Sequence, residues 1–154
     1  MRLAIRSAVV TACLLVLAQS APAELAPWDQ AKVTGLAKQF ESATAELSRS
    51  FRKQPSPQRG TPQSVPFWKL NQEVRQLRRE ARSLSRALQR GADRDETLPS
   101  YDSLMQTVRS AQDNARRVFT VTDVSDRATA ARDILNQMTP FYDPNAVPLQ
   151  PVGR

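Results

Sequence analysis

The sequence predicts an all-α protein, an antiparallel four-helix bundle with a long proline-rich connection between its first and second helices. Four stretches place apolar residues at steps of three and four, which keeps those residues on one face of a helix. Prolines and glycines fall between these stretches, and a short loop between two of them favours antiparallel neighbours. The chain has 154 residues, which is enough for one domain with its own core.

Residues 1–23 have the organisation of a secretory signal peptide. Arg2 and Arg6 give a basic start, residues 8–18 form an apolar run, and Ala-Pro-Ala at 21–23 supplies the small residues of a cleavage site. The apolar run is much shorter than the roughly 20 residues needed to span a bilayer, and no later stretch is longer. We therefore expect a periplasmic or secreted protein with no transmembrane segment after cleavage.

The helical bundle domain should occupy residues 24–139, and its first helix should run from about Pro27 to Lys53. The buried stripe of that helix is Val33, Leu36, Phe40, Ala43, Leu47 and Phe51. Residues 54–66 contain four prolines, which remove backbone donors, so this stretch is expected to be a non-helical linker. Such a linker can span about 40 Å. It therefore leaves the direction of the second helix relative to the first open.

The clearest helix is predicted over residues 67–90. Its apolar face consists of Phe67, Leu70, Val74, Leu77, Ala81, Leu84 and Leu88. Gly91 suits the left-handed conformation that ends a helix.

A short acidic loop, residues 92–96, should lead to the third helix. Thr97 or Ser100 can cap that helix, with Pro99 tolerated in its opening turn. The predicted inner face of the third helix is Tyr101, Leu104, Val108, Ala111, Ala115 and Val118.

Asp123 is expected to cap the fourth helix, and Pro140 is expected to end it. The inner face of this helix should be Val124, Ala128, Ala131, Leu135 and Met138. Residues 140–154 contain four prolines and should form an extended tail. The tail either covers a groove between helices or binds a partner.

The sequence contains no histidine, and its one cysteine, Cys13, lies inside the predicted signal peptide. These absences exclude thiol catalysis, histidine-dependent triads, haem attachment through Cys-x-x-Cys-His and ordinary zinc sites. We expect no enzymatic activity, no cofactor and no metal site.

The candidate binding residues are four arginines with helical spacing on the outward face of the helix at 67–90: Arg75, Arg79, Arg82 and Arg86. That helix carries seven basic and two acidic residues, and neither glutamate has a basic residue four positions further on. The row is either a solvated face or a surface for an anionic envelope component or an acidic protein. Nucleic acid is not expected, because the protein is predicted to be exported and aromatic residues do not alternate with the arginines.

The leading hypothesis is an exported, non-enzymatic binding or accessory protein of the cell envelope. A periplasmic holdase-type chaperone is the alternative, and a hydrolase that uses carboxylates alone is a third. The third hypothesis needs two converging acids, whereas the carboxylates are spread singly along the helices. Self-association through the heptad-like apolar faces also remains open.

Overall fold

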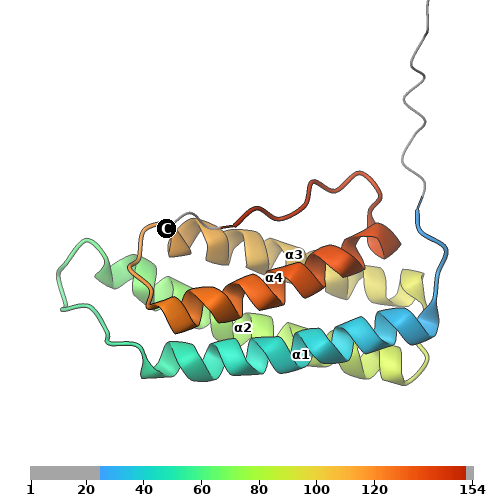
Figure 1. Ribbon diagram of the computed structural model, residues 1–154, viewed down its shortest axis with the longest axis horizontal. Helices are drawn as coiled ribbons and strands as arrows, with labels where there is room; N and C mark the ends of the chain where they lie inside the picture. Colours follow the sequence, from blue (N-terminus) through green and yellow to red (C-terminus); the bar gives the residue numbers. More distant parts are fainter. Residues whose placement is uncertain (1–24, 152–154) are drawn as a thin grey trace, which may run out of the picture.

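A computed structural model describes residues 25–151, and within this range the chain forms four helices and no strand (Figure 1). The helices are α1 (Gln30–Lys53), α2 (Ser64–Gln89), α3 (Arg94–Ala115) and α4 (Thr122–Tyr142). They pack side by side as a bundle, which confirms the predicted all-α class. The expected signal peptide lies outside the described residues.

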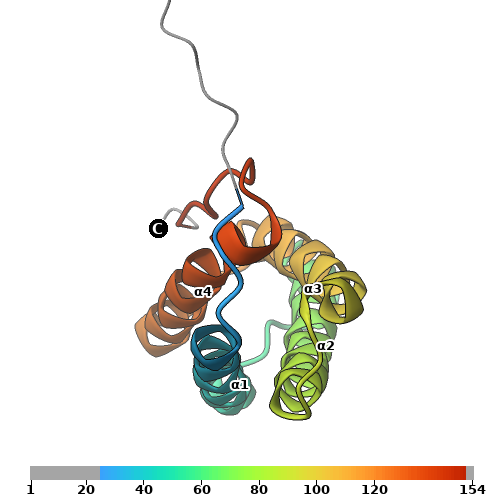
Figure 2. The same ribbon diagram turned by 90° about the vertical axis from the view of Figure 1, so that its right-hand side faces the viewer.

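The four helices are arranged in an arc, which Figure 2 shows end-on. α1 lies between α2 and α4, α3 packs on the other side of α2, and direct contact between α3 and α4 is slight. The rings of Phe51 and Phe67 stack with their centroids 5.1 Å apart, so the last turn of α1 meets the first turn of α2. At the other end, the side-chain amide of Gln30 donates to the carbonyls of Leu88 and Ala92, which ties the start of α1 to the end of α2.

The core forms where the predicted apolar faces meet. All seven apolar residues predicted for the second helix are buried, and Leu104, Leu135 and Met138 are fully enclosed. A large cluster joins all four helices, and a smaller one fills the end of the bundle near the connection between α1 and α2. Burial of each large aliphatic side chain contributes about 1.5–3 kcal/mol, so these faces are the main source of stability.

One residue assigned to the inner face of the fourth helix is exposed. Ala128 lies between Val124, which belongs to the smaller cluster, and Ala131, which belongs to the larger one. Because α4 packs mainly on α1 and hardly touches α3, no neighbouring helix covers Ala128. The prediction that Ala128 belongs to the inner face of the fourth helix was therefore wrong.

Several helix boundaries differ from those predicted, and capping explains the largest difference. The helix α3 begins at Arg94 because Asp93 caps it, and Asp93 and Glu96 exchange hydrogen bonds with each other's backbone amides. The predicted caps, Thr97 and Ser100, lie inside the helix. The acidic stretch that the sequence predicts to be a loop instead forms the cap and the first turn of α3. Negatively charged side chains are favourable there because they lie next to the positive end of the helix dipole.

Prolines also mark helix ends less strictly than predicted. Pro66 lies in the first turn of α2. Backbone N–H groups in the first turn have no acceptor within the helix, so a proline, which lacks the N–H, is tolerated there. Pro140 lies inside α4, which continues to Tyr142 because Phe141 and Tyr142 are buried in the larger cluster. Val121, not Asp123, occupies the N-cap position of α4, and Asp123 lies in its first turn.

The segment after α4 runs back along the bundle (Figure 1). Asn136 of α4 pairs with the backbone of Leu149 through both its amide nitrogen and its carbonyl oxygen, at 3.3 and 3.0 Å. Gln112 of α3 donates to the carbonyl of Gln150 at 3.2 Å. The segment thus links α3 to α4, two helices that have little direct contact with each other.

Candidate anion-binding surface

The four predicted arginines all lie exposed on the outward face of α2. Arg82 forms an ion pair with Glu41 of α1 at 3.6 Å, and its side chain keeps 56% of its exposure. Arg75, Arg79 and Arg86 make no ion pair and no side-chain hydrogen bond with any other residue between 25 and 151. Three of the four guanidinium groups therefore have no partner among the described residues.

Three of these arginines border a hollow of about 300 Å³ between α1 and α2. Its lining consists of Ser48, Arg75, Arg78, Arg79 and Arg82. Arg78 is not one of the four predicted arginines, but it flanks their row on the α1 side of α2 and forms part of the hollow. Arg86 lies one helical turn beyond Arg82 and does not line it.

The glutamates of α2 do not neutralise this surface, because their side chains are engaged by α3. Glu73 accepts hydrogen bonds from Ser110 and from the amide of Asn114. Glu80 accepts one from Ser103 at 3.0 Å. The acids of α2 thus help to join it to α3, while its arginines face solvent and α1.

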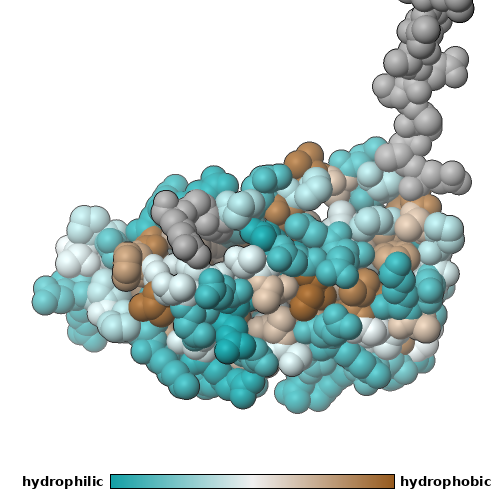
Figure 3. All heavy atoms as spheres, in the orientation of Figure 1, coloured by the Kyte–Doolittle hydropathy of each residue, from teal (hydrophilic) through white to brown (hydrophobic). Residues whose placement is uncertain are grey.

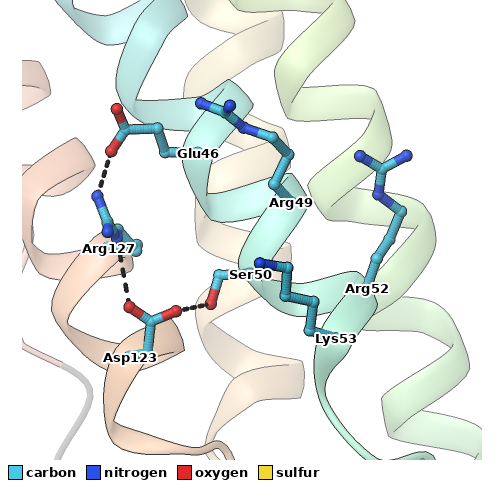
Figure 4. Close-up of a pocket in the computed structure, with 7 residues that line it drawn as sticks. All are labelled: Glu46, Arg49, Ser50, Arg52, Lys53, Asp123 and Arg127. Atoms are coloured by element: carbon cyan, nitrogen blue, oxygen red, sulfur yellow. Dashed lines mark hydrogen bonds and ion pairs between the residues drawn. The ribbon is translucent and has the colours of Figure 1, made fainter.

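A second hollow, of about 520 Å³, lies where the last turns of α1 meet the start of α4 (Figure 4). On one side of it, Arg127 bridges Glu46 and Asp123, and Asp123 also accepts a hydrogen bond from Ser50. That hydrogen bond, together with the positive charge of Arg127, holds the pKa of Asp123 below its usual value. This carboxylate therefore stays ionised and acts as a structural link between α1 and α4.

The other side of this second hollow is basic. Arg49, Arg52 and Lys53 border it, and Figure 4 draws no hydrogen bond or ion pair between any of them and the acids shown there. Sequence reasoning did not single out these residues, because their relation to α2 depends on how α1 packs. Together with the arginines of α2 they extend the basic surface onto a second helix.

An exposed tryptophan continues the arginine row, and sequence reasoning missed it. Trp68 precedes Arg75 by seven residues, which is two turns, so both residues lie on the same face of α2. Its side chain is 60% exposed, and that of Val65, one turn earlier, is 61% exposed. The spacing of seven was the signal in the sequence that could have identified Trp68.

Metal ions in proteins are usually held by groups of side chains that lie close together. Between residues 25 and 151, no three side chains of the histidine, cysteine, aspartate or glutamate type come together in a group able to hold one. Within the same range, no helix has the length and apolar character needed to cross a membrane.

Comparison of the chain with family models, with curated proteins and with solved structures finds no match. The basic surface of α2 is therefore the main basis for assigning a function.

Proposed function

We propose that this protein is an exported, non-enzymatic binding or accessory protein of the cell envelope, and that the outward face of α2 binds an anionic or acidic partner. The row of exposed arginines along this helix carries the proposal. Arg75, Arg78 and Arg79 border one hollow, and none of them has an ion pair within residues 25–151. Guanidinium groups arranged in this way suit multivalent contact with phosphate or carboxylate groups.

The arrangement has an energetic cost that a bound anion would relieve. Arg75 and Arg79, Arg78 and Arg82, and Arg82 and Arg86 are like-charge pairs one turn apart, and each pair destabilises a helix by a few tenths of a kcal/mol. The only ion pair that this row receives from the described residues is the one between Arg82 and Glu41. A bound polyanion would replace repulsion along the row with attraction.

The proposal includes an antiparallel arrangement of the helices with a proline-rich connection, and export through the predicted signal peptide. Contacts between the end of α1 and the start of α2 support the antiparallel order of these two helices. Glu80 contacts Ser103 whereas the earlier Glu73 contacts the later Ser110, which supports the same order for α2 with α3. The contact of Tyr101, near the start of α3, with Thr139, near the end of α4, supports it for α3 with α4. The basic start, apolar run and small residues at the beginning of the chain support export.

The proposal predicts that Arg75→Glu/Arg79→Glu greatly reduces retention of the protein on phosphocellulose. Neither residue has an ion pair within residues 25–151, so the change removes the proposed contacts without breaking a described interaction. The measurement is the salt concentration needed for elution, which should be much lower for the variant, since surface ionic contacts are screened by salt. Reversal of Arg82 is less informative because it would place a carboxylate opposite Glu41.

The matched control is Arg109→Glu/Arg117→Glu, which changes the net charge by the same amount. Both residues are exposed, on α3 and just after it. The control should elute close to the unmodified protein, and both variants should keep the same helical circular dichroism. Equally early elution of the two variants would show that net charge alone governs retention, which would overturn the proposal.

The two other hypotheses receive less support. A holdase needs an accessible apolar groove, whereas the predicted apolar faces are packed and the last described residues already lie across α3 and α4. A carboxylate-only hydrolase needs one acid with a raised pKa beside a second carboxylate. Glu46 and Asp123 line the same hollow, but Arg127 bridges them, and the pKa of Asp123 is lowered.

A further inference from the structure

The row on α2 continues from its arginines to an exposed aromatic residue. Trp68, Arg75, Arg79, Arg82 and Arg86 follow one another at steps of seven, four, three and four, so they share the outward face of the helix. From Trp68 to Arg86 the row is about 27 Å long, given a rise of 1.5 Å per residue. The surface is therefore a long line of cations with a tryptophan at one end.

Further basic and apolar groups gather at the tryptophan end. Stacking of Phe51 on Phe67 places the last turn of α1, with Arg52 and Lys53, at the same end of the bundle as Trp68. Phe119, in the connection between α3 and α4, is 75% exposed, and Gln54 at the end of α1 bonds to its carbonyl at 3.1 Å. Figure 3 shows hydrophobic side chains on the surface at this end, at the left of the view, beside largely hydrophilic ones.

We infer that this surface docks on the phosphate layer of an anionic lipid membrane, with the arginines of α2 against the headgroups and Trp68 at the polar–apolar boundary. This inference rests on the proposed function and names its partner. Tryptophan prefers the interface of a bilayer, where its ring is in apolar surroundings and its N–H stays hydrated. Basic side chains next to an anionic leaflet each strengthen binding, and arginine pairs well with phosphate.

The order of residues along the row favours a lipid surface over an acidic protein. Binding energy at protein interfaces usually centres on a desolvated cluster in which arginines pack beside aromatic residues, with a polar rim around it. Here the centre is occupied by arginines, and the aromatic residue lies at the end. A line of about 27 Å with evenly spaced cations suits a flat sheet of repeating phosphates better than one compact acidic patch.

The test is co-sedimentation of the purified protein with vesicles made of equal parts phosphatidylglycerol and phosphatidylcholine, compared with phosphatidylcholine alone. Binding should require the anionic lipid and should weaken as salt is raised. Arg75→Glu/Arg79→Glu should weaken it by at least about tenfold, since each cation near an anionic surface contributes roughly fivefold. The control Arg109→Glu/Arg117→Glu should bind within a few-fold of the unmodified protein.

Fluorescence locates the tryptophan. In a Trp28→Phe background Trp68 is the only tryptophan, and its emission should shift to the blue with anionic vesicles but not with tripolyphosphate. Trp28 packs edge-on against Tyr142 at 5.6 Å, so its replacement requires a check of folding by circular dichroism. If that variant fails to fold, Trp68→Ser in the unmodified chain replaces it, and sedimentation with anionic vesicles should fall severalfold.

The outcomes separate this inference from the proposed function. Arginine-dependent binding of tripolyphosphate or polyglutamate, without binding to anionic vesicles, overturns the lipid inference and leaves the proposed function standing. Failure to bind any of the three probes overturns both. Vesicle binding that survives reversal of Arg75 and Arg79 places the membrane contact elsewhere and also overturns the inference.

Discussion

Two tyrosines stack face to face near the end of the bundle opposite Trp68. The rings of Tyr101 and Tyr142 lie 4.1 Å apart, and their hydroxyl groups bond to Thr139 and Thr97, each at 3.0 Å. Burial raises the pKa of Tyr101 to about 12, from an ordinary value of 10.0, and burial also raises the pKa of Tyr142. The negative charge of a tyrosinate is unfavourable in these buried surroundings, because little water is present to solvate it.

The raised pKa predicts that the protein loses stability as pH rises from about 10 to about 12. In this range the unfolded chain releases the proton of Tyr101 more readily than the folded protein does, so ionisation favours unfolding, whereas below pH 10 the contribution is complete. Tyr101→Phe should lower the free energy of unfolding at neutral pH by about 1 kcal/mol, because the hydrogen bond to Thr139 is lost. Its alkaline loss of stability should, however, be clearly smaller.

Urea unfolding of both proteins at about pH 8 and about pH 11 measures this difference. Some alkaline loss should persist in Tyr101→Phe, because Tyr142 still titrates. An equal loss in the two proteins would show that Tyr101 does not link pH to stability.

At the scale of the helix, α2 combines a buried face that stabilises the fold with an outward face that opposes it. Arg79 lies one turn from both Arg75 and Arg82, and no described acid pairs with it. Arg79→Gln should therefore raise the free energy of unfolding by a few tenths of a kcal/mol at low salt. The gain should shrink as salt screens the repulsion.

The control for this change is Arg109→Gln on α3, where Asp113 lies four residues further on. That substitution removes a cation near an acid and should not stabilise the protein. Thermal unfolding at low and high salt compares the two variants. A loss of stability in Arg79→Gln at low salt would show that the arginine row contributes to the fold itself.

The sequence predicts those features of the helices that depend only on the local geometry of the chain. The apolar stripe of α2 was predicted residue by residue, because a helix repeats every 3.6 residues and its buried face must follow that period. Helix ends were predicted less well. The Asp93–Glu96 pair is a capping pattern visible in the sequence, whereas the continuation of α4 past Pro140 depends on packing of Phe141 and Tyr142, which no local rule reveals.

At the scale of the whole molecule, the arrangement of the helices decides which face of α2 stays open. α1 and α3 cover its two flanks, so the face between them, with the arginines, remains exposed. The sequence identified Arg75, Arg79 and Arg82 through their spacing, but the part played by Ser48 and Arg78 in the hollow depends on the packing of α1 on α2. The basic side chains at the end of α1 could not be related to the row for the same reason.

The most direct test of the proposed binding surface is an NMR titration of the arginine side-chain N–H signals with tripolyphosphate. We predict that the shifts concentrate on the arginines of α2, with Arg75, Arg78, Arg79 and Arg82 changing together at low concentrations of the anion. Arg109 and Arg117 should change little under the same conditions. Shifts of equal size for all exposed arginines, or shifts that are largest on α3, would contradict the assignment of this surface as the binding site.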